Sequence, residues 1–279
     1  ERLSIHIKLN ESADLNLKIL DGVDILILGN PIGDYFTRTE IRVIADYVRT
    51  GGSCFIISEY GGDLSQKMNI NDLTGKYLCI YFQNNIVKEK NKLNENCHSL
   101  LCIQHFPSHA ITKQLREVLM GGACSLYTNG DITPILISSE DSWNEKFMES
   151  NLKTYPHEEN VAQVLAACRE YGKGKVFALG DIDIFLNSNI NRMDNRNFIL
   201  NALNWLTEPL KDSEILSFIL SQMGQFQNEM KDMNTKINNI IESMRFLEER
   251  ITLLEEASEQ SRKEREFTSR KMEERTTFI

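Results

Sequence analysis

The chain has 279 residues, which is enough for one large α/β domain and an extension. Its formal net charge of −9 argues against broad binding to the phosphate backbone of nucleic acids. No apolar run approaches the roughly 20 residues that a helix needs to cross a bilayer. The six cysteines are scattered, several within apolar runs, which favours a reduced, cytoplasmic protein with buried thiols. Because the sequence begins with Glu1 rather than Met, we expect its natural start to be missing.

The first predicted elements are two strands, a helix and another strand. Residues 3–9 alternate apolar and polar side chains, which predicts a strand. Residues 24–29 and 53–58 are further apolar runs, and the amphipathic segment between them predicts a helix. Thr37 and Glu40 have the spacing of a capping box, which places the start of this helix. Such a crossover gives parallel strands, and ligands bind beyond the carboxyl ends of parallel strands.

The rest of the first 209 residues alternates short apolar runs with amphipathic segments. Strand-like runs are residues 78–87, 100–104, 123–127, 132–138, 161–168 and 175–179. Helices or helical turns are expected at residues 64–68, 70–77, 113–119 and 195–206. Residues 139–160 are polar and predict an exposed excursion. We therefore expect an α/β fold with a mostly parallel, flavodoxin- or amidotransferase-like (Rossmann-like) sheet and helices on both faces.

The sequence changes character after residue 209. Apolar residues then recur at steps of three and four over more than five heptads, which indicates a coiled coil. The residues of this repeat, which we expect to mediate oligomerisation, are Leu216, Ile219, Met223, Phe226, Met230, Met233, Ile237, Ile240, Met244, Leu247, Ile251 and Leu254. They predict a long C-terminal coiled-coil helix over residues 210–257, roughly 60 Å long, in a parallel dimer. A helix packed back along the α/β domain is the alternative. Residues 258–279 are charged and predict a frayed or disordered tail.

Three segments of the α/β domain resemble one known family. They read DILILGNPIGDYFTRTEIRVIADYVRTGGSCFIISEYGGD (residues 24–63), SHAITKQLREVLMGGACSL (residues 108–126), and GKGKVFALGDIDIF followed by NRNFILNALNWL (within residues 172–206). In the same order, they resemble the GIFT domain. That domain is shared by a ciliary intraflagellar-transport B-complex subunit and by gliding-motility ABC-transporter accessory proteins, and it is itself similar to class I glutamine amidotransferases.

The resemblance implies a position for a catalytic nucleophile. In class I amidotransferases, the strand after this crossover ends in a G-x-C-x-G elbow, which holds a thiolate at a helix N-terminus. Residues 57–62 take this place here, and Glu59 stands about where the cysteine would be. A carboxylate cannot replace a thiolate as the acyl acceptor for a glutamine amide. We therefore expect no amidotransferase activity.

Several residues are candidates for lining a cleft at the carboxyl ends of the strands. They are Gly33, Glu59, Gly61, Gly62, His109, Asp181 and Asp183. Two of the acidic residues also have an ordinary structural interpretation, with Glu59 as a turn residue and Asp181 as the cap of the following segment. His109 resembles the histidine of the family's H-x-I-T segment, although Ala110 stands where the family has proline. This histidine either lines the cleft or bonds a backbone carbonyl.

Other cysteine and histidine residues give weaker patterns. Cys97, Cys102, His105 and His109 form a loose group, but paired C-x-x-C spacing is missing and we expect no metal. Cys124 follows a glycine pair but lacks the glycine that an elbow needs two residues later, so a core thiol is favoured. No nucleotide-binding glycine motif is present, and we expect no cofactor.

These observations predict a non-catalytic scaffold or binding protein that oligomerises through its heptad segment. The resemblance implies protein partners in a transport or membrane-associated assembly, together with a sugar or peptide ligand. Two alternatives stay open. One is a cleft hydrolase or lyase that uses Glu59, His109 and either Asp181 or Asp183. The other is a sensor that binds a small ligand such as a sugar.

Overall fold

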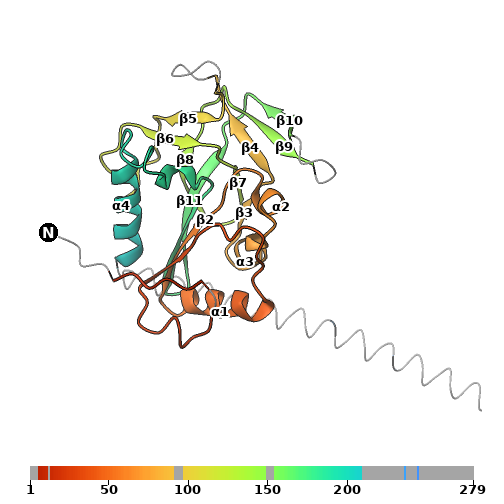
Figure 1. The fold of residues 1–279 in the computed structure, drawn as a ribbon, viewed down its shortest axis with the longest axis vertical. Coiled ribbons are helices and arrows are strands. Elements are labelled where there is room, and N and C mark those ends of the chain that lie inside the picture. Colours follow the sequence, from red (N-terminus) through yellow and green to blue (C-terminus); the bar gives the residue numbers. More distant parts are fainter. Residues whose placement is uncertain are drawn as a thin grey trace, which may run out of the picture. The chain divides into compact units, whose positions relative to one another are not determined.

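The computed structural model describes residues 6–11, 13–90, 97–148 and 154–208, together with the single residues Lys236 and Met244. The chain divides into two units, Glu1–Ile215 and Leu216–Ile279, and the first unit is the α/β domain (Figure 1). Its helices are α1 (Arg38–Arg49), α2 (Gly62–Gln66), α3 (Ile70–Tyr77) and α4 (Asn195–Thr207), with a 3₁₀ turn η1 (Asp183–Phe185). Its strands are β1 (Ile25–Leu28), β2 (Ser53–Ile57), β3 (Ile80–Phe82), β4 (Asn85–Lys88), β5 (Leu100–Ile103), β6 (Val118–Gly121), β7 (Leu126–Thr128), β8 (Thr133–Ile137), β9 (Trp143–Phe147), β10 (Thr154–Glu159), β11 (Val164–Tyr171) and β12 (Gly174–Leu179).

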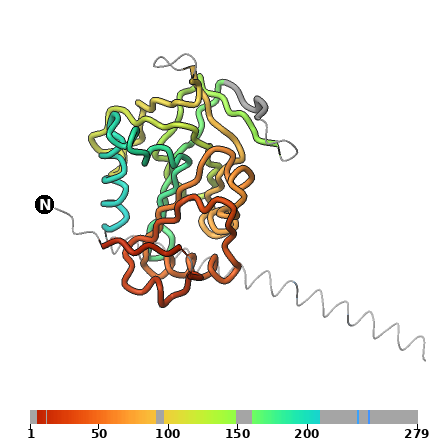
Figure 2. Tube along the Cα trace, in the orientation of Figure 1, coloured from red at the N-terminus to blue at the C-terminus, as the bar shows by residue number. Residues whose placement is uncertain are grey.

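The predicted crossover of strand, helix and strand is confirmed. Strands β1 and β2 pair in parallel, with Ile25 opposite Ser53, and α1 lies between them in the sequence. Thr37 is the N-cap of α1, and both hydrogen bonds of the capping box with Glu40 are present. The side chain of Glu40 also accepts a hydrogen bond from the amide of Leu15, which ties the segment before β1 to α1. The trace in Figure 2 shows this early segment, in the darkest red, at the same end of the domain as α1.

The prediction of a mostly parallel sheet is wrong. The main sheet has the strand order β1-β2-β12-β11-β8, in which β1, β2 and β12 are parallel and β11 is antiparallel to both its neighbours. The reason is the tight turn around Gly172, because strands joined by a hairpin must run antiparallel. The fold is therefore a β-rich α/β fold with a mixed main sheet.

Three small antiparallel sheets add to this β content, in the pairings β10-β9-β4, β3-β7 and β5-β6. Residues 113–119, predicted to form a helix or a turn, begin in a turn and end in β6, which pairs with β5 from Leu100 to Ile103. The polar residues 139–160, predicted to be an exposed excursion, contain β9 and β10. Pairing with neighbouring strands thus determines the secondary structure of these segments, because their local sequence patterns are ambiguous.

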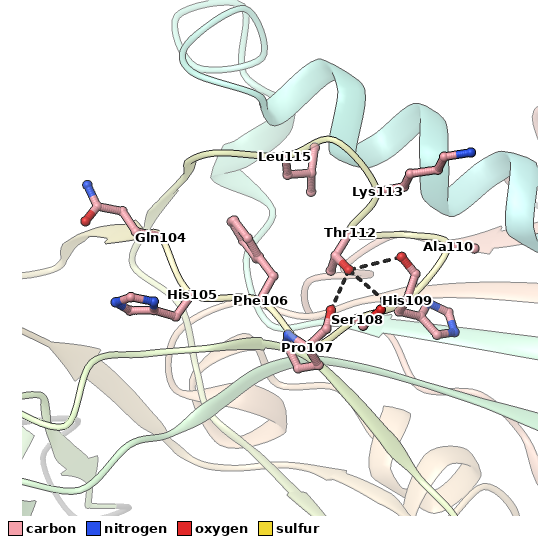
Figure 3. Close-up of a pocket in the computed structure, with 10 residues that line it drawn as sticks. All are labelled: Gln104, His105, Phe106, Pro107, Ser108, His109, Ala110, Thr112, Lys113 and Leu115. Carbon is pink, nitrogen blue, oxygen red and sulfur yellow. Dashed lines mark hydrogen bonds between the residues drawn. The ribbon is translucent and has the colours of Figure 1, made fainter.

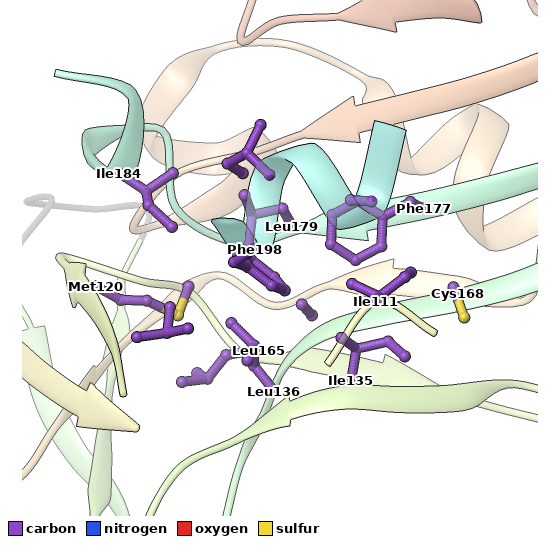
Figure 4. Packing of buried hydrophobic residues seen from close by; sticks show 14 of the residues in the cluster. Ile111, Met120, Ile135, Leu136, Leu165, Cys168, Phe177, Leu179, Ile184 and Phe198 are labelled. Carbon is purple, nitrogen blue, oxygen red and sulfur yellow. The ribbon is translucent and has the colours of Figure 1, made fainter. Parts of the chain in front are cut away.

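Helices cover both faces of the main sheet, as the sequence predicts. On one face, residues of α1 and α3 pack in a cluster with Cys54 and Ile56 of β2. On the other face, α4 packs with the alternate residues of β2 and β12, such as Phe55 and Phe177. The ring centroids of Phe177 and Phe198 lie 5.7 Å apart, and Figure 4 shows Phe198 of α4 within this cluster.

The predicted C-terminal coiled-coil helix is not found in the described structure. All residues of the heptad repeat except Met244 lie outside the described residues. Met244 is helical, and its side chain is 56% exposed. The fold prediction is therefore wrong on two points, the mostly parallel sheet and the long C-terminal coiled-coil helix. Among the described residues, no helix is long and apolar enough to cross a membrane.

Candidate functional site at the carboxyl ends of β2 and β12

Glu59 lies just beyond the carboxyl end of β2 and is almost entirely buried, with 4% of its surface exposed. One carboxylate oxygen, Oε1, accepts a 3.0 Å hydrogen bond from the amide of Tyr60. The other, Oε2, accepts a 3.1 Å hydrogen bond from the amide of Ile182, which follows β12. The side chain predicted to occupy the nucleophile position therefore ties two strand ends together.

Asp181 makes a second bridge of the same kind. Its side chain is fully buried, Oδ2 accepts a 2.7 Å hydrogen bond from the amide of Gly121, and Oδ1 accepts one of 2.8 Å from the amide of Asp183. Asp183 begins the η1 turn, and its side chain is half-buried. The structure thus brings Glu59, Asp181 and Asp183 together, at the junction of β2, β6 and β12.

Burial dominates the electrostatics of this acidic group. Loss of solvent raises the pKa of Glu59 to about 8, and the negative charges of Asp181 and Asp183 add to the rise. Loss of solvent likewise raises the pKa of Asp181 to about 7, and Asp183 contributes in the same direction. The backbone amides that bond both carboxylates oppose these shifts without cancelling them.

Two of the predicted glycines, Gly61 and Gly62, allow close packing in this structure. Gly61 and Gly62 have φ values of +75° and +49° and form the turn from β2 into α2. A Cβ atom on Gly61 would lie 2.3 Å from Ser65, and one on Gly62 would lie 2.9 Å from the carbonyl oxygen of Gln83. Gly33 is exposed, and its amide donates to the carbonyl of Gln66 at the end of α2. The turns after β1 and β2 therefore meet, as parallel neighbouring strands require.

His109 is in a different place. Its Nε2 atom lies 3.7 Å from the thiol of Cys168, and Cys168 is opposite Phe177 in the β11–β12 register. Asp181 comes four residues after Phe177, which is roughly 13 Å farther along the strand direction. The structure therefore does not bring His109 to Glu59 or Asp181, and the three-residue cleft of the hydrolase alternative is not assembled.

The contact between His109 and Cys168 lacks the features of an activated thiol. The Nδ1 atom of His109 accepts a 3.2 Å hydrogen bond from the amide of Ile111, and the ring packs edge-on against Trp205. Burial, followed by the positive charge of Lys175, lowers the pKa of His109. Burial raises the pKa of the Cys168 thiol to about 12. A neutral imidazole beside a protonated thiol is a packing contact rather than a nucleophile and its base.

The remaining cysteines are separated from one another. Cys124 is fully buried, and its burial raises the pKa of its thiol. The thiol of Cys102 faces the sulfur of Met193, whereas Cys97 contacts Ser99. Across the described ranges, no group of three or more His, Cys, Asp or Glu side chains has an arrangement suited to a metal ion.

A surface cavity of about 600 Å³ lies in the loop between β5 and β6 (Figure 3). His105 and His109 are among its lining residues, and Thr112 fixes the loop by hydrogen bonds to the carbonyls of Pro107 and His109. Asn201 of α4 donates hydrogen bonds to the carbonyls of Ile111 and Lys113 in the same loop. The cavity therefore lies within one loop that hydrogen bonds hold in place, and it is separate from Glu59, Asp181 and Asp183.

Sequence reasoning missed the residues that close the site. Gly122 has a φ of +88°, and a Cβ atom there would lie 3.1 Å from Oε1 of Glu59. Gly121 supplies the amide that holds Asp181. The glycine pair itself was the signal, because adjacent glycines mark places where backbone approaches another group closely.

Comparison with known proteins identifies the fold. No protein-family model matches the chain, and no curated protein matches it in sequence. Among solved structures, the mmIFT52 N-terminal domain matches with a TM-score of 0.56 and 19% sequence identity, over 68% of this chain and 80% of that one. The domain therefore has a GIFT-like fold.

Two cytoplasmic proteins of Salmonella typhimurium are more distant matches. STM1381, from strain LT2, has a TM-score of 0.48 with 13% identity, over 69% of this chain and 76% of its own. STM3548 has a TM-score of 0.47 with 12% identity, over 72% of this chain and 76% of its own.

Proposed function

We propose that the GIFT-like domain is a non-catalytic binding module of a protein assembly. The observation that carries this proposal is Glu59, whose two carboxylate oxygens are both occupied by backbone amides in a site that is closed to solvent. A nucleophile or general base must be able to contact a bound substrate, and the buried side chain of Glu59 does not face an open cleft. Glu59 instead uses its acceptors to join β2 to the turn after β12.

The surroundings of Glu59 support the same proposal. Asp181 is fully buried and holds the amides of Gly121 and Asp183, so it is also engaged. His109, the one histidine that the sequence placed in the cleft, lies beside Cys168 instead. A site filled by its own side chains and backbone amides leaves the domain's outer surfaces as the place for recognition.

The fold and the sequence resemblance both support the proposed kind of assembly. The likeness to the mmIFT52 N-terminal domain supports a GIFT-like scaffold. The resemblance to GIFT domains implies an intraflagellar-transport-like or ABC-transporter-associated assembly, in which this chain binds other proteins. Oligomerisation of the chain belongs to this proposal as well. Glu59, Asp181 and His109 are engaged within the domain and are not proposed as ligand-binding positions.

An amidase assay tests the absence of catalysis. Wild-type protein and Glu59→Gln are incubated with L-glutamine, and ammonia release is measured by an enzyme-coupled assay. We expect both proteins to match the protein-free blank. Ammonia release by the wild type that Glu59→Gln abolishes would overturn the proposal.

For the binding role, the tagged full chain from its own cells is expected to sediment with other proteins at a fixed stoichiometry. Sedimentation as this chain alone would contradict that role.

A further inference from the structure

The cavity in the loop between β5 and β6 has the size and lining of a ligand site. Its volume of about 600 Å³ lies within the range of roughly 300–1,000 Å³ that is usual for ligand pockets. Phe106 and Leu115 form part of its lining and are half-buried, because both also pack against the hydrophobic cluster beneath α4 (Figure 3). No acidic side chain lines the cavity, whereas Lys113 does. The lining therefore suits an apolar group that is followed by a negative charge.

Hydrogen bonds hold this cavity open without a ligand. The hydroxyl of Thr112, which is buried, donates a 2.6 Å hydrogen bond to the carbonyl of Pro107 across the loop. Asn201 of α4 holds the carbonyls of Ile111 and Lys113 at 3.1 and 3.0 Å. A site that is already formed binds its ligand without the cost of ordering a loop.

Four cationic residues lie around the cavity. The amide of Arg116, at the end of the loop, donates a 2.7 Å hydrogen bond to the carboxylate of Asp194, and Arg192 and Arg196 are each two residues from Asp194. Lys113 is held by α4 about one and a half turns after Arg196, which is roughly 7.5 Å along the helix axis. All four cationic residues are exposed, and within the described part of the chain their side chains form no ion pair.

This positive charge contrasts with the rest of the chain. Residues 104–117 and 186–207 together contain four Lys or Arg and two Asp or Glu, whereas the whole chain has a net charge of −9. Both acidic residues are engaged, because Glu117 accepts a 2.9 Å hydrogen bond from Gln104 and Asp194 accepts the amides of Arg116 and Glu117. The surface formed by the cavity, Lys113, Arg116, Arg192 and Arg196, which we call the loop–α4 surface, therefore attracts anionic groups.

We propose that the loop–α4 surface binds an acidic peptide segment of a partner protein, with one apolar side chain of that segment in the cavity. The proposal rests on the proposed binding role and names the chemistry of the partner. Charge complementarity and the position of the cations favour a peptide. Three of them, Arg116, Arg192 and Arg196, lie outside the lining of the cavity, so a small anion inside it would leave them unmatched. An extended peptide advances roughly 3.3 Å per residue and reaches them within a few residues.

Binding of defined peptide pools to the purified full chain tests this proposal. The pools contain fluorescent peptides of about eight residues, which span roughly 26 Å when extended. One pool has a central Leu or Phe flanked by Asp and Glu, a second has Lys and Arg in place of the acids, and a third keeps the acids but has a central Ala. We expect the first pool to bind about tenfold or more tightly than the other two, and to bind more weakly at high salt. Equal affinities among the pools would overturn the proposal.

Charge reversal places the peptide on the loop–α4 surface. The double variant Lys113→Glu with Arg116→Glu is expected to weaken binding of the first pool about tenfold. Its fold should be retained, since both residues bond to α4 through backbone groups. Lys18→Glu with Lys146→Glu is the matched control, because it changes the charge equally at two exposed lysines outside these segments. Equal affinities of the two double variants would overturn the proposal.

A substitution at Ser108 tests the cavity itself. Ser108 is exposed and lines the cavity, so Ser108→Trp fills it and is expected to weaken binding about tenfold, whereas Ser108→Ala leaves it open and is expected to bind as the wild type does. Equal binding by both variants would overturn the proposal. Displacement of the first pool by an equal concentration of single-stranded DNA would also overturn it, in favour of a nucleic acid.

Sedimentation separates this proposal from the broader binding role. We expect the Lys113→Glu, Arg116→Glu chain to lose a protein that sediments with the wild type, and the Lys18→Glu, Lys146→Glu chain to keep it. If both chains sediment with the same proteins as the wild type, the loop–α4 proposal fails and the binding role stands. If the wild type sediments alone, the binding role itself fails.

Discussion

The Oε2 atom of Glu59 accepts a 3.1 Å hydrogen bond from the backbone amide of Ile182. This bond joins the end of β2 to the turn after β12, two strands that are neighbours in the main sheet but far apart in the sequence. The carboxylate stays buried to make it, and its raised pKa is the cost of that burial. The properties of the site follow from this structural use of a buried carboxyl group.

Stability is expected to fall as the pH rises from about 5 to 8. The folded-state pKa values of Glu59 and Asp181, about 8 and about 7, lie above their ordinary values. The native state therefore binds more protons than the unfolded state in this range, and the unfolding free energy decreases with pH. Urea unfolding at pH 5.5, 7.0 and 8.5 measures the slope. A flat or rising curve would show that these two groups do not titrate as described.

Gly122→Ala is expected to destabilise the domain through its contact with Glu59. The new Cβ would lie 3.1 Å from Oε1 of Glu59, at a backbone φ of +88°. Gly130→Ala is the matched control, because Gly130 has a similar φ of +80° and no atom within 4 Å of the new Cβ. Both substitutions have the backbone cost, of order 1 kcal/mol. An additional loss of about 1 kcal/mol is expected for Gly122→Ala alone in urea unfolding, and equal losses would argue against the close contact.

Two buried serines of the β2 segment should respond oppositely to alanine. Ser53 donates a 2.7 Å hydrogen bond to the carbonyl of Leu206, so Ser53→Ala is expected to cost about 1–2 kcal/mol. The hydroxyl of Ser58 is fully buried beside the thiol of Cys124, without an oxygen or nitrogen partner. Ser58→Ala is therefore expected to be neutral or stabilising, since a poorly bonded hydroxyl is removed. Thermal unfolding of both variants gives the comparison, and a larger loss for Ser58→Ala would contradict it.

Thr37→Ala is expected to lower the unfolding free energy by about 1 kcal/mol, because it removes the side-chain cap of α1. Thr39→Ala, two residues later on the exposed surface of the same helix, is the control and should be neutral or slightly stabilising. Chemical unfolding of the two variants distinguishes a loss of capping from a loss of threonine. Equal losses of unfolding free energy in the two variants would show that the capping box does not stabilise α1.

The parts of the fold that depend on local sequence were predictable. The capping box of Thr37 and Glu40, the apolar runs that became β1 and β2, and the amphipathic α4 all carry signals within a few residues. The mixed sheet was harder. The glycines around Gly172 are a local signal for the hairpin between β11 and β12, but the antiparallel pairing of β8 with β11 joins strands that β9 and β10 separate in the sequence. Residues 113–119 have a helical pattern, but pairing of β6 with β5 prevails, and such non-local pairing leaves little trace in one sequence.

Only part of the candidate site could be predicted from the sequence. Glu59 and Asp181 each follow an apolar run, so the sequence could place both at strand ends, but the structure was needed to show that these two strands are neighbours. The position of His109 could not, because the loop after β5 has no regular structure to fix its direction. The contribution of Gly122 could not be predicted, because the atom that a Cβ there would meet belongs to Glu59, 63 residues earlier in the sequence.

A carboxyl-resolved ¹³C NMR titration of Glu59 tests the central claim most directly. The claim is that this side chain is withdrawn from solvent and used to join two strand ends, so that it is not available for chemistry. The account predicts a pKa near 8 for Glu59 in the wild-type protein. A pKa near the ordinary 4.5 would mean a solvated carboxylate in an open cleft, and that result would contradict the account.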